Sequence, residues 1–507
     1  MSSIITNNYR ISAAQKFINS IEQKNNSLYV YLARINNWPD ENNIPVPQDT
    51  VNEHVLSGTE ILYLKKISRS NSSLAIKRYN WQKNYIYNMY RSDIDLFDTQ
   101  LNAKPFYVFT EENNIYKCIF NNLDRPSKNK PTGKSSNIFS TGDGYLWKYM
   151  YSVTDDLSSF LIDEFIPVKN TKTVVDVDKG ISSLYLSNKG TGYTTGNNNI
   201  ILTGNGSGFS GYVSFKNGTA DSVVITNKGV GYTEVSSVTL QNTTTGTSAV
   251  IIPVINPPLG HGSNPAQELG GNYVLQGASF FQNENSKISI KNDFRRIGIL
   301  ENPLSYKNPS VSATDEILSQ IHKIKISNIV GATDYVPDET VTSTSGISAK
   351  VLEYDNVSFI LYLAQVSGQF DVNDTITGAT SGMSASVISS ETGSIGSVVS
   401  ASVNTIRFAN TFTGTFDSSE FDILVKINSG KGINQTRIVK SYDVSTQTAT
   451  LSKSWNIVPD STSTYILSYY KLPDIYPQSG NILHISNIRT VIRDTYQNET
   501  ILCCISF

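Results

Sequence analysis

Helical periodicity is confined to a few short stretches of this chain. From Ser12 to Gln23, apolar residues recur at intervals of three and four, which places them on one face of a helix. A second helix is expected over 61–67, because Ser57-Gly58-Thr59-Glu60 just before it fits a capping box. A third short helix is expected from Asp315 to His322.

Alternation of apolar and polar residues, typical of strands, covers much more of the sequence. It predicts a strand from Ser27 to Ala33 and a hairpin of two strands within Phe106 to Phe120. Asp143-Gly144 supplies a turn, after which alternation resumes. The apolar run from Ile501 to Phe507 predicts a closing strand. The pattern therefore indicates a mainly β fold with a few α-helices.

Residues 181–256 contain an internal duplication. The segment 187–194 returns as 226–233, each time as Ser/Thr-Asn-Lys-Gly-x-Gly-Tyr-Thr after a short apolar strand. The glycines permit a tight turn with positive φ, and Tyr193 and Tyr232 can then lie back over the sheet. We therefore expect a compact β module made of two similar halves.

A second duplication lies further along the chain. The segment 339–351 is echoed by 374–387, and the second copy carries one extra turn residue. Each copy has two alternating strands joined by a Thr/Ser/Gly turn, and short strands continue at Thr405 to Phe408 and Phe421 to Ile427. The segment 313–472 is therefore expected to hold one or two β modules.

Composition narrows the classes of partner. The 507 residues carry a formal net charge of −2 and 17% charged residues, which gives no field strong enough to collect nucleic acid or an anionic membrane. Cys118, Cys503 and Cys504 do not make a disulfide framework. The first residues lack the layout of a secretory signal, and no apolar run approaches the ~20 residues of a membrane span. We expect a soluble protein made in a cytoplasm, with no nucleic-acid or membrane partner.

Several fragments match catalytic or binding motifs only in part. Gly133-Lys134-Ser135 imitates the end of a phosphate loop, but Lys128 stands where that loop needs glycine. The glycine-rich run 204–211 lies inside the duplicated module, where a turn explains it better. The acidic pairs at 155–156 and 163–164 would serve glycoside hydrolysis only within a cleft, and a solvated loop is the simpler interpretation.

Metal and nucleophile chemistry are also unsupported. The histidines, His54, His261, His322 and His484, stand singly without neighbours at metal-ligand spacing, and no Gly-x-Ser-x-Gly elbow is present. We therefore expect no catalytic, cofactor-binding or metal-binding residues, no cofactor, and no enzymatic activity.

A series of motifs nevertheless stands in a recognisable order. The strongest is Gly142-Asp143-Gly144-Tyr145-Leu146-Trp147-Lys148-Tyr149, and the others are 77–81, 116–118, 165–168, 294–304, 480–487 and 494–500. In this order they resemble the baseplate wedge subunit of T-even-type contractile-tailed bacteriophages, the product of gene eight. The run 258–265 resembles versions from phages of marine cyanobacteria. The resemblance covers about 1–170, 260–312 and 475–507 and omits both duplicated regions.

The resemblance implies a multidomain, β-sandwich-like core. Residues 1–75, 262–312 and 473–507 would form one discontinuous wedge core domain, and 76–170 a second β-rich domain. The segments 171–261 and 313–472 would be inserted β modules. It also implies a homodimer packed against other baseplate wedge proteins in the virion tail, assembled in the host cytoplasm.

Two functions from different classes remain. In the first, the chain is a structural component of the baseplate wedge, contributing to baseplate assembly and to the attachment-triggered rearrangement that leads to sheath contraction. The alternative is a carbohydrate-binding or depolymerising tail adhesin that touches the host surface through its inserts, with Tyr193 and Tyr232 stacked on sugars. Depolymerisation would need a pair of carboxylates. The 181–256 module has just two acidic residues, Asp221 and Glu234, and they stand apart in the sequence.

Overall fold

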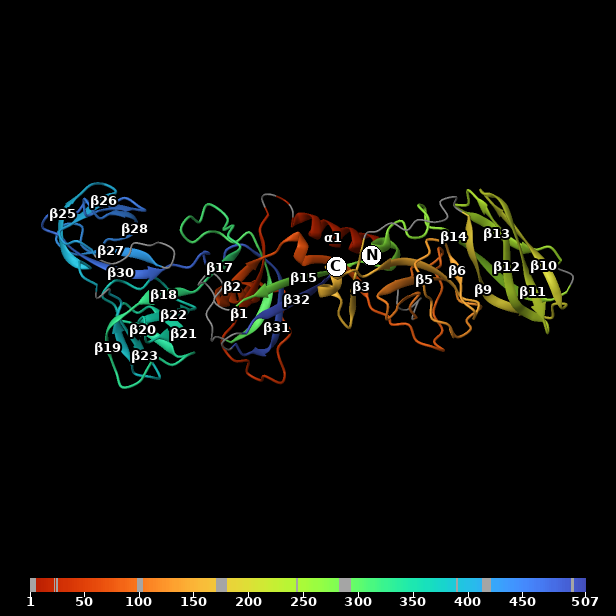
Figure 1. The fold of residues 1–507 in the computed structure, drawn as a ribbon, viewed down its shortest axis with the longest axis horizontal. Helices are drawn as coiled ribbons and strands as arrows, with labels where there is room; N and C mark the ends of the chain where they lie inside the picture. Colours follow the sequence, from red (N-terminus) through yellow and green to blue (C-terminus); the bar gives the residue numbers. More distant parts are fainter. Residues whose placement is uncertain are drawn as a thin grey trace. The chain divides into compact units, whose positions relative to one another are not determined.

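The chain is a mainly β protein with a few α-helices, as the sequence predicts (Figure 1). The computed structural model describes residues 6–21, 23, 26–97, 104–169, 180–242, 245–281, 293–388, 391–412, 421–493 and 497–507. Among these residues, no helix has both the length and the apolar character needed to cross a membrane.

The chain divides into two compact units. Unit 1 contains Met1–Glu22, Arg69–Gly277 and Leu502–Phe507, and unit 2 contains Gln23–Ser68 and Ala278–Ile501. Both units are therefore assembled from segments that are distant in sequence. The two units divide each of the segments 1–75, 262–312 and 473–507 between them, so they do not correspond to the four expected domains, whose boundaries stay a prediction.

Helix α1 (Asn7–Ser20) belongs to unit 1 and confirms the first expected helix, although it begins and ends earlier than the sequence pattern suggests. Thr6 caps it, with its hydroxyl accepting a hydrogen bond from the Tyr9 amide at 3.4 Å. Ile11, Ala14 and Ile18 lie on its buried face. The apolar spacing of three and four thus directs this face into the core of the unit.

Two four-stranded sheets form the rest of the non-duplicated part of unit 1. One has the order β32-β15-β3-β8 and the other β4-β5-β7-β6. The expected closing strand and the expected hairpin are confirmed as β32 and as β4 with β5, and Gly144 takes the positive φ of the expected turn. The elements are β3 (Ser72–Lys77), β4 (Tyr107–Phe109), β5 (Asn114–Phe120), β6 (Phe139–Ser140), β7 (Leu146–Ser152), β8 (Phe165–Pro167), β15 (Tyr273–Phe280), β32 (Glu499–Ser506), α3 (Pro265–Leu269) and the 3₁₀ turns η1 (Arg69–Asn71) and η2 (Asp155–Phe160).

The first duplication forms a module of six strands in unit 1. One sheet has the order β12-β11-β10-β13, and β14 pairs with β9. Each half contributes three strands, and the third strand of each half pairs with the first strand of the other. The two halves are therefore interlocked rather than stacked. The strands are β9 (Ile181–Thr191), β10 (Gly196–Gly204), β11 (Ser207–Lys216), β12 (Thr219–Val230), β13 (Val235–Leu240) and β14 (Thr247–Ile255).

Unit 2 contains a five-stranded sheet made of three distant segments. Its order is β17-β2-β1-β16-β31, and β1 confirms the strand expected at 27–33. Tyr29 and Tyr31 are buried in this sheet, and the Tyr29 hydroxyl donates to the Asp315 carbonyl at 2.9 Å. The elements are β1 (Leu28–Ala33), α2 (Val51–Glu60), β2 (Ile61–Lys66), β16 (Phe294–Glu301), β17 (Ile317–Ser319) and β31 (Asn481–Val491).

The remainder of unit 2 is a sheet of thirteen strands. Part of it closes into a barrel, because β30, β25, β26, β29, β28 and β27 pair in sequence and β27 pairs back with β30. The hairpins expected at 339–351 and 374–387 are confirmed as β20 with β21 and β23 with β24. The strands are β18 (His322–Lys325), β19 (Ser327–Val330), β20 (Thr340–Ser343), β21 (Ser348–Asp355), β22 (Ile360–Ala364), β23 (Thr375–Gly378), β24 (Ser384–Ser386), β25 (Ile395–Ala401), β26 (Thr405–Phe408), β27 (Asp422–Ser429), β28 (Thr436–Asp443), β29 (Thr448–Leu451) and β30 (Thr464–Lys471).

Two of the expected helices are wrong. The run 61–67 forms strand β2, and α2 ends where that helix should begin. The N-terminal cap lies instead at Thr50, whose hydroxyl accepts from the Glu53 amide at 3.2 Å. Residues 61–65 are buried without a polar face, as in a central strand, so the apolar spacing alone did not distinguish strand from helix.

The helix expected from Asp315 to His322 is also replaced by strands. β17 pairs with β2, and His322 opens β18. A helix of this length is marginal in water, and pairing with the edge of an existing sheet satisfies the same backbone groups.

Candidate functional site

The partial motifs found in the sequence do not form a catalytic constellation. The loop containing Gly133 and Lys134 leads into β6 rather than a helix, and the Gly133 carbonyl accepts a hydrogen bond from the Tyr116 hydroxyl at 2.7 Å. The glycine-rich run 204–211 covers the end of β10, the turn at 205–206 and the start of β11. Both glycine-containing segments therefore form turns and loops between strands.

The acidic pairs are also solvated. Asp155 and Asp156 lie exposed on η2, and the exposed Asp163 carboxylate lies 3.9 Å from the Arg78 guanidinium. None of these four acidic positions is among the described residues that line the clefts of about 360, 300, 460 and 650 Å³.

The histidines lie apart as well. His54 lies 3.2 Å from the exposed Asp49 carboxylate, and the buried His322 ring lies 2.7 Å from the Tyr470 hydroxyl. Burial lowers the pKa of His322 to about 3 and also lowers that of His484. Among the described residues, no group of three or more His, Cys, Asp or Glu side chains is placed to hold a metal ion.

The two repeat tyrosines cover glycines of their own module. The Tyr193 ring stacks on Phe215 with 4.0 Å between centroids, and a Cβ atom at Gly246 would overlap its other side. In the second half, Tyr232 is buried and a Cβ atom at Gly206 would overlap its ring. The turns before the two tyrosines have the same hydrogen bond. The side chains of Asn188 and Asn227 each accept from the backbone amide of the glycine two residues later, at 2.9 Å. The rings are therefore occupied by internal packing rather than presented to a sugar.

This packing gives a first testable prediction. Gly246→Ala places a methyl group against the Tyr193 ring at a residue whose φ is +80°, so we expect it to destabilise the module by about 1–3 kcal/mol. Amide hydrogen exchange in β9 and β14 measures the loss. Gly142→Ala is the control, because its added Cβ meets nothing closer than 3.8 Å. Equal protection in both variants would contradict the packing role.

The second duplication is locked by two reciprocal carboxylates. Glu339, at the start of the first copy, accepts hydrogen bonds from the amides of Thr380 and Ser381 in the second copy, each at 3.0 Å. Asp374, at the start of the second copy, accepts from the hydroxyls of Thr344 and Ser345 in the first copy at 3.1 and 2.6 Å. Each copy therefore holds the turn of the other.

The charge on Glu339 makes this lock sensitive to acid. Burial opposes ionisation of Glu339, but the hydrogen bonds from the Ser381, Val336 and Thr380 amides outweigh it and leave its pKa below the usual 4.5. A lowered carboxyl pKa stabilises the fold above about pH 4.5, and this stabilisation is lost as pH falls through the folded-state value.

We therefore expect Glu339→Gln to lower the stability of this sheet by about 1–2 kcal/mol at pH 7. The difference from the parent should shrink as pH falls below 4.5, because the parent then becomes neutral at this position as well. Hydrogen exchange of β20 and β23 between pH 7 and pH 3 measures it. A difference that stays constant over this range would rule out the ionised lock.

Unit 1 also contains a buried lysine–glutamate pair. Lys117, on β5, is fully buried and contacts the Glu268 carboxylate on α3, whose side chain is 7% exposed. Glu268 also accepts from the Gly262 and Asn264 amides at 2.8 and 3.2 Å. Burial lowers the pKa of Lys117, and the charge of Glu268 opposes that shift. The pair therefore joins the β5 sheet to the 262–268 segment.

Aromatic side chains close this pair from solvent. The Lys117 ammonium lies 4.7 Å from the centre of the Tyr90 ring, which meets the buried His261 ring edge-on at 5.0 Å. Neither His261 ring nitrogen has a hydrogen-bond partner within the described part of the chain. Burial, followed by the charge of Lys117, holds the pKa of His261 well below its usual value, so the ring is neutral.

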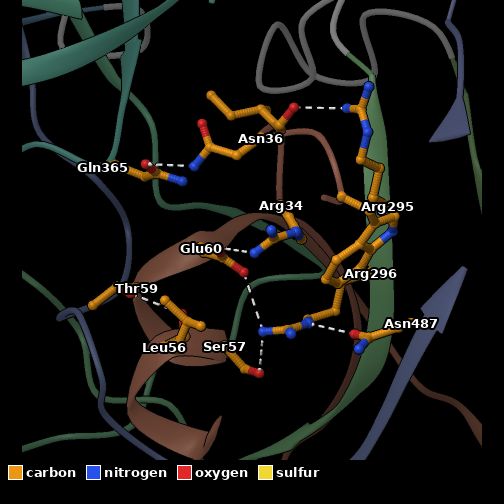
Figure 2. A network of polar contacts seen from close by, with 12 residues as sticks. Arg34, Asn36, Leu56, Ser57, Thr59, Glu60, Arg295, Arg296, Gln365 and Asn487 are labelled. Carbon is orange, nitrogen blue, oxygen red and sulfur yellow. Dashed lines mark hydrogen bonds and ion pairs between the residues drawn. The ribbon is translucent and has the colours of Figure 1, made fainter. Parts of the chain in front are cut away.

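The corresponding cluster of unit 2 is centred on Arg296, as Figure 2 shows. Its guanidinium donates to the Ser57 hydroxyl at 2.7 Å, to the Glu60 carboxylate at 3.1 Å and to the Asn487 side chain at 2.8 Å. It also pairs with the Glu53 carboxylate. One side chain thus joins α2, β16 and β31.

Arg34 completes the charge balance of this cluster. It donates to the second oxygen of Glu60 at 2.7 Å, and its guanidinium lies 3.9 Å from the centre of the Trp38 ring. Burial raises the pKa of Glu60, and the charges of Arg34 and Arg296 act against that rise. Arg34 and Arg296 thus balance Glu53 and Glu60, so these four side chains carry no net charge together.

The sequence missed both clusters because their members are far apart in the chain. Lys117 and Glu268 are separated by 151 positions, and Arg296 and Glu60 by 236. The only available signal was a charged residue inside a strand-like run, as at Lys117 within 115–120.

Comparison with known proteins does not assign the chain to a family. No family model matches the chain, and no curated protein matches it.

Proposed function

We propose that the chain is a structural subunit of a contractile phage tail, in the baseplate wedge. One observation carries the proposal: apart from β17, every described strand pairs only within the family-like segments (1–170, 260–312, 475–507), only within 181–255, or only within 322–471. The segments that resemble the wedge family thus share their own sheets. Each duplicated region forms separate sheets, as expected of modules inserted into an older core.

The chemistry of the described residues supports the same role. The ionic clusters around Arg296 and Lys117 are buried, charge-balanced and bonded between distant segments. Such arrangements fix a helix or loop against its sheet and so make each unit rigid, which a subunit that transmits a rearrangement through its interfaces requires. Sugar binding by the two repeat tyrosines is disfavoured, because the Tyr193 ring stacks on Phe215 and Tyr232 is buried within the module.

The proposal is tested by assembly. The purified chain should sediment at twice its mass of 55.9 kDa and should bind other wedge proteins encoded beside it without added nucleotide. Density for the chain in a cryo-EM map of contractile tails should lie in the baseplate. A monomer that binds none of those proteins, or density elsewhere in the tail, would overturn the proposal.

A further inference from the structure

The described residues that line a cleft of about 360 Å³ in unit 1 include positive but no negative side chains. Arg10 on α1, Lys77 at the end of β3 and Lys104 before β4 are exposed and line it together. No aspartate or glutamate is among its described lining residues. On a chain with a net charge of −2, three converging cations are a local exception.

Within the described ranges, no carboxylate neutralises these cations. Neither Arg10 nor Lys77 nor Lys104 forms an ion pair with a carboxylate in the described ranges. The Asn7 side-chain nitrogen, also at this cleft, is buried without a hydrogen-bond acceptor. Donors without acceptors around one cavity favour an anionic occupant.

One wall of the cleft is aromatic. Phe97 and Tyr79 are half-buried there and pack on the buried rings of Phe106 and Tyr107, with successive ring centroids 5.7, 5.4 and 5.3 Å apart along Phe97, Phe106, Tyr107 and Tyr79. The half-buried Tyr273 also lines the cleft. A ring-shaped body packs well on such a wall, and tyrosine hydroxyls bind its polar edge.

A second cleft next to the first has a different charge pattern. That cleft, of about 650 Å³, shares Asn7, Leu96 and Phe97 with the first but is lined by Asp95 and Glu268 as well as by Arg91. An anion entering it would meet carboxylates. Of these two adjoining clefts, the cationic one therefore suits a multiply charged oxyanion better.

We propose that the cationic cleft binds a phosphate group attached to a ring, as in a phosphorylated sugar. Three cations match the double charge of a phosphate monoester better than the single charge of a carboxylate. The aromatic wall receives the ring, and the volume is within the range of small-molecule sites. The same chemistry occurs in free sugar phosphates and in phosphorylated cell-surface glycans. The site does not depend on the proposed assembly role.

The test is calorimetric titration of the full chain with glucose 1-phosphate, inorganic phosphate and glucose. Glucose 1-phosphate should bind more tightly than either of the others, and its affinity should fall as salt is raised. Lys77→Met and Lys104→Met should each weaken binding about tenfold, since each removes a charge-assisted contact. Lys134→Met is the matched control, because Lys134 is exposed on a loop outside the cleft.

Thermal unfolding of each variant shows that it is folded. Absence of binding, equal affinity for inorganic phosphate and glucose 1-phosphate, or unchanged binding in both cleft variants would overturn the proposal. A phosphorylated oligosaccharide distinguishes the sources. Tighter binding than the monosaccharide indicates a surface glycan, and weaker binding indicates a free sugar phosphate.

Discussion

Arg296→Met is expected to destabilise unit 2 by about 3 kcal/mol, because it removes a guanidinium that is 1% exposed from a bonded ionic cluster. The substitution keeps much of the side-chain volume but leaves Ser57, Glu60 and Asn487 without their shared donor. Hydrogen exchange of peptides from β1 and β16 reports this loss without assuming that both units unfold together.

The loss should depend on pH in a defined direction. Burial already raises the pKa of Glu60, and without Arg296 that pKa should rise further. A carboxyl group with a raised folded-state pKa loses stability as pH rises from its unfolded value of 4.5. The variant should therefore differ more from the parent at pH 7 than at pH 5.

Two further variants separate charge from geometry. Arg296→Lys keeps the charge but not the fork of donors, so it should lose an intermediate amount of stability. Arg489→Met, at an exposed arginine of β31, should change stability by less than about 0.5 kcal/mol. If Arg296→Met were as mild as Arg489→Met, the cluster would not hold α2 to its sheet.

Local patterns predicted those features whose cause is local. The turn at Asp143-Gly144 and the two Gly-x-Gly-Tyr turns of the first module could be read from the sequence, because a positive φ favours glycine at known offsets. The alternation of strands likewise follows from which face each residue presents. Such signals need only a few neighbouring residues.

Features set by distant partners could not be predicted this way. Ser57-Gly58-Thr59-Glu60 has the letters of a capping box, but Ser57 and Glu60 bind Arg296 and the helix there is ending. The run after it is a strand because β1 and β17 lie on either side. The cationic cleft was missed for the same reason, since its three cations come from three separate elements.

Lys117→Met is the second large effect, expected to destabilise unit 1 by about 3 kcal/mol. The Glu268 carboxylate would then lie buried without its counter-charge, and its Oε1 would keep the Gly262 and Asn264 amides and the Ser263 hydroxyl as hydrogen-bond donors. Glu268→Gln should cost a similar amount, because it leaves a fully buried ammonium facing Lys148, its cross-strand neighbour in the register. Hydrogen exchange of β5 and β7 peptides measures both.

The double variant Lys117→Met with Glu268→Gln decides whether the two side chains act as a pair. Once both charges are absent, neither is left uncompensated, so the total loss should be clearly smaller than the sum of the single losses. The Glu268→Gln variant should also regain stability as pH rises above neutral, because burial lowers the pKa of Lys117 and the folded state then loses its proton before the unfolded state does. Lys216→Met, an exposed lysine of the same unit, should show neither effect. Strictly additive losses would mean that the ammonium and the carboxylate stabilise the unit separately, and that the contact between them contributes nothing.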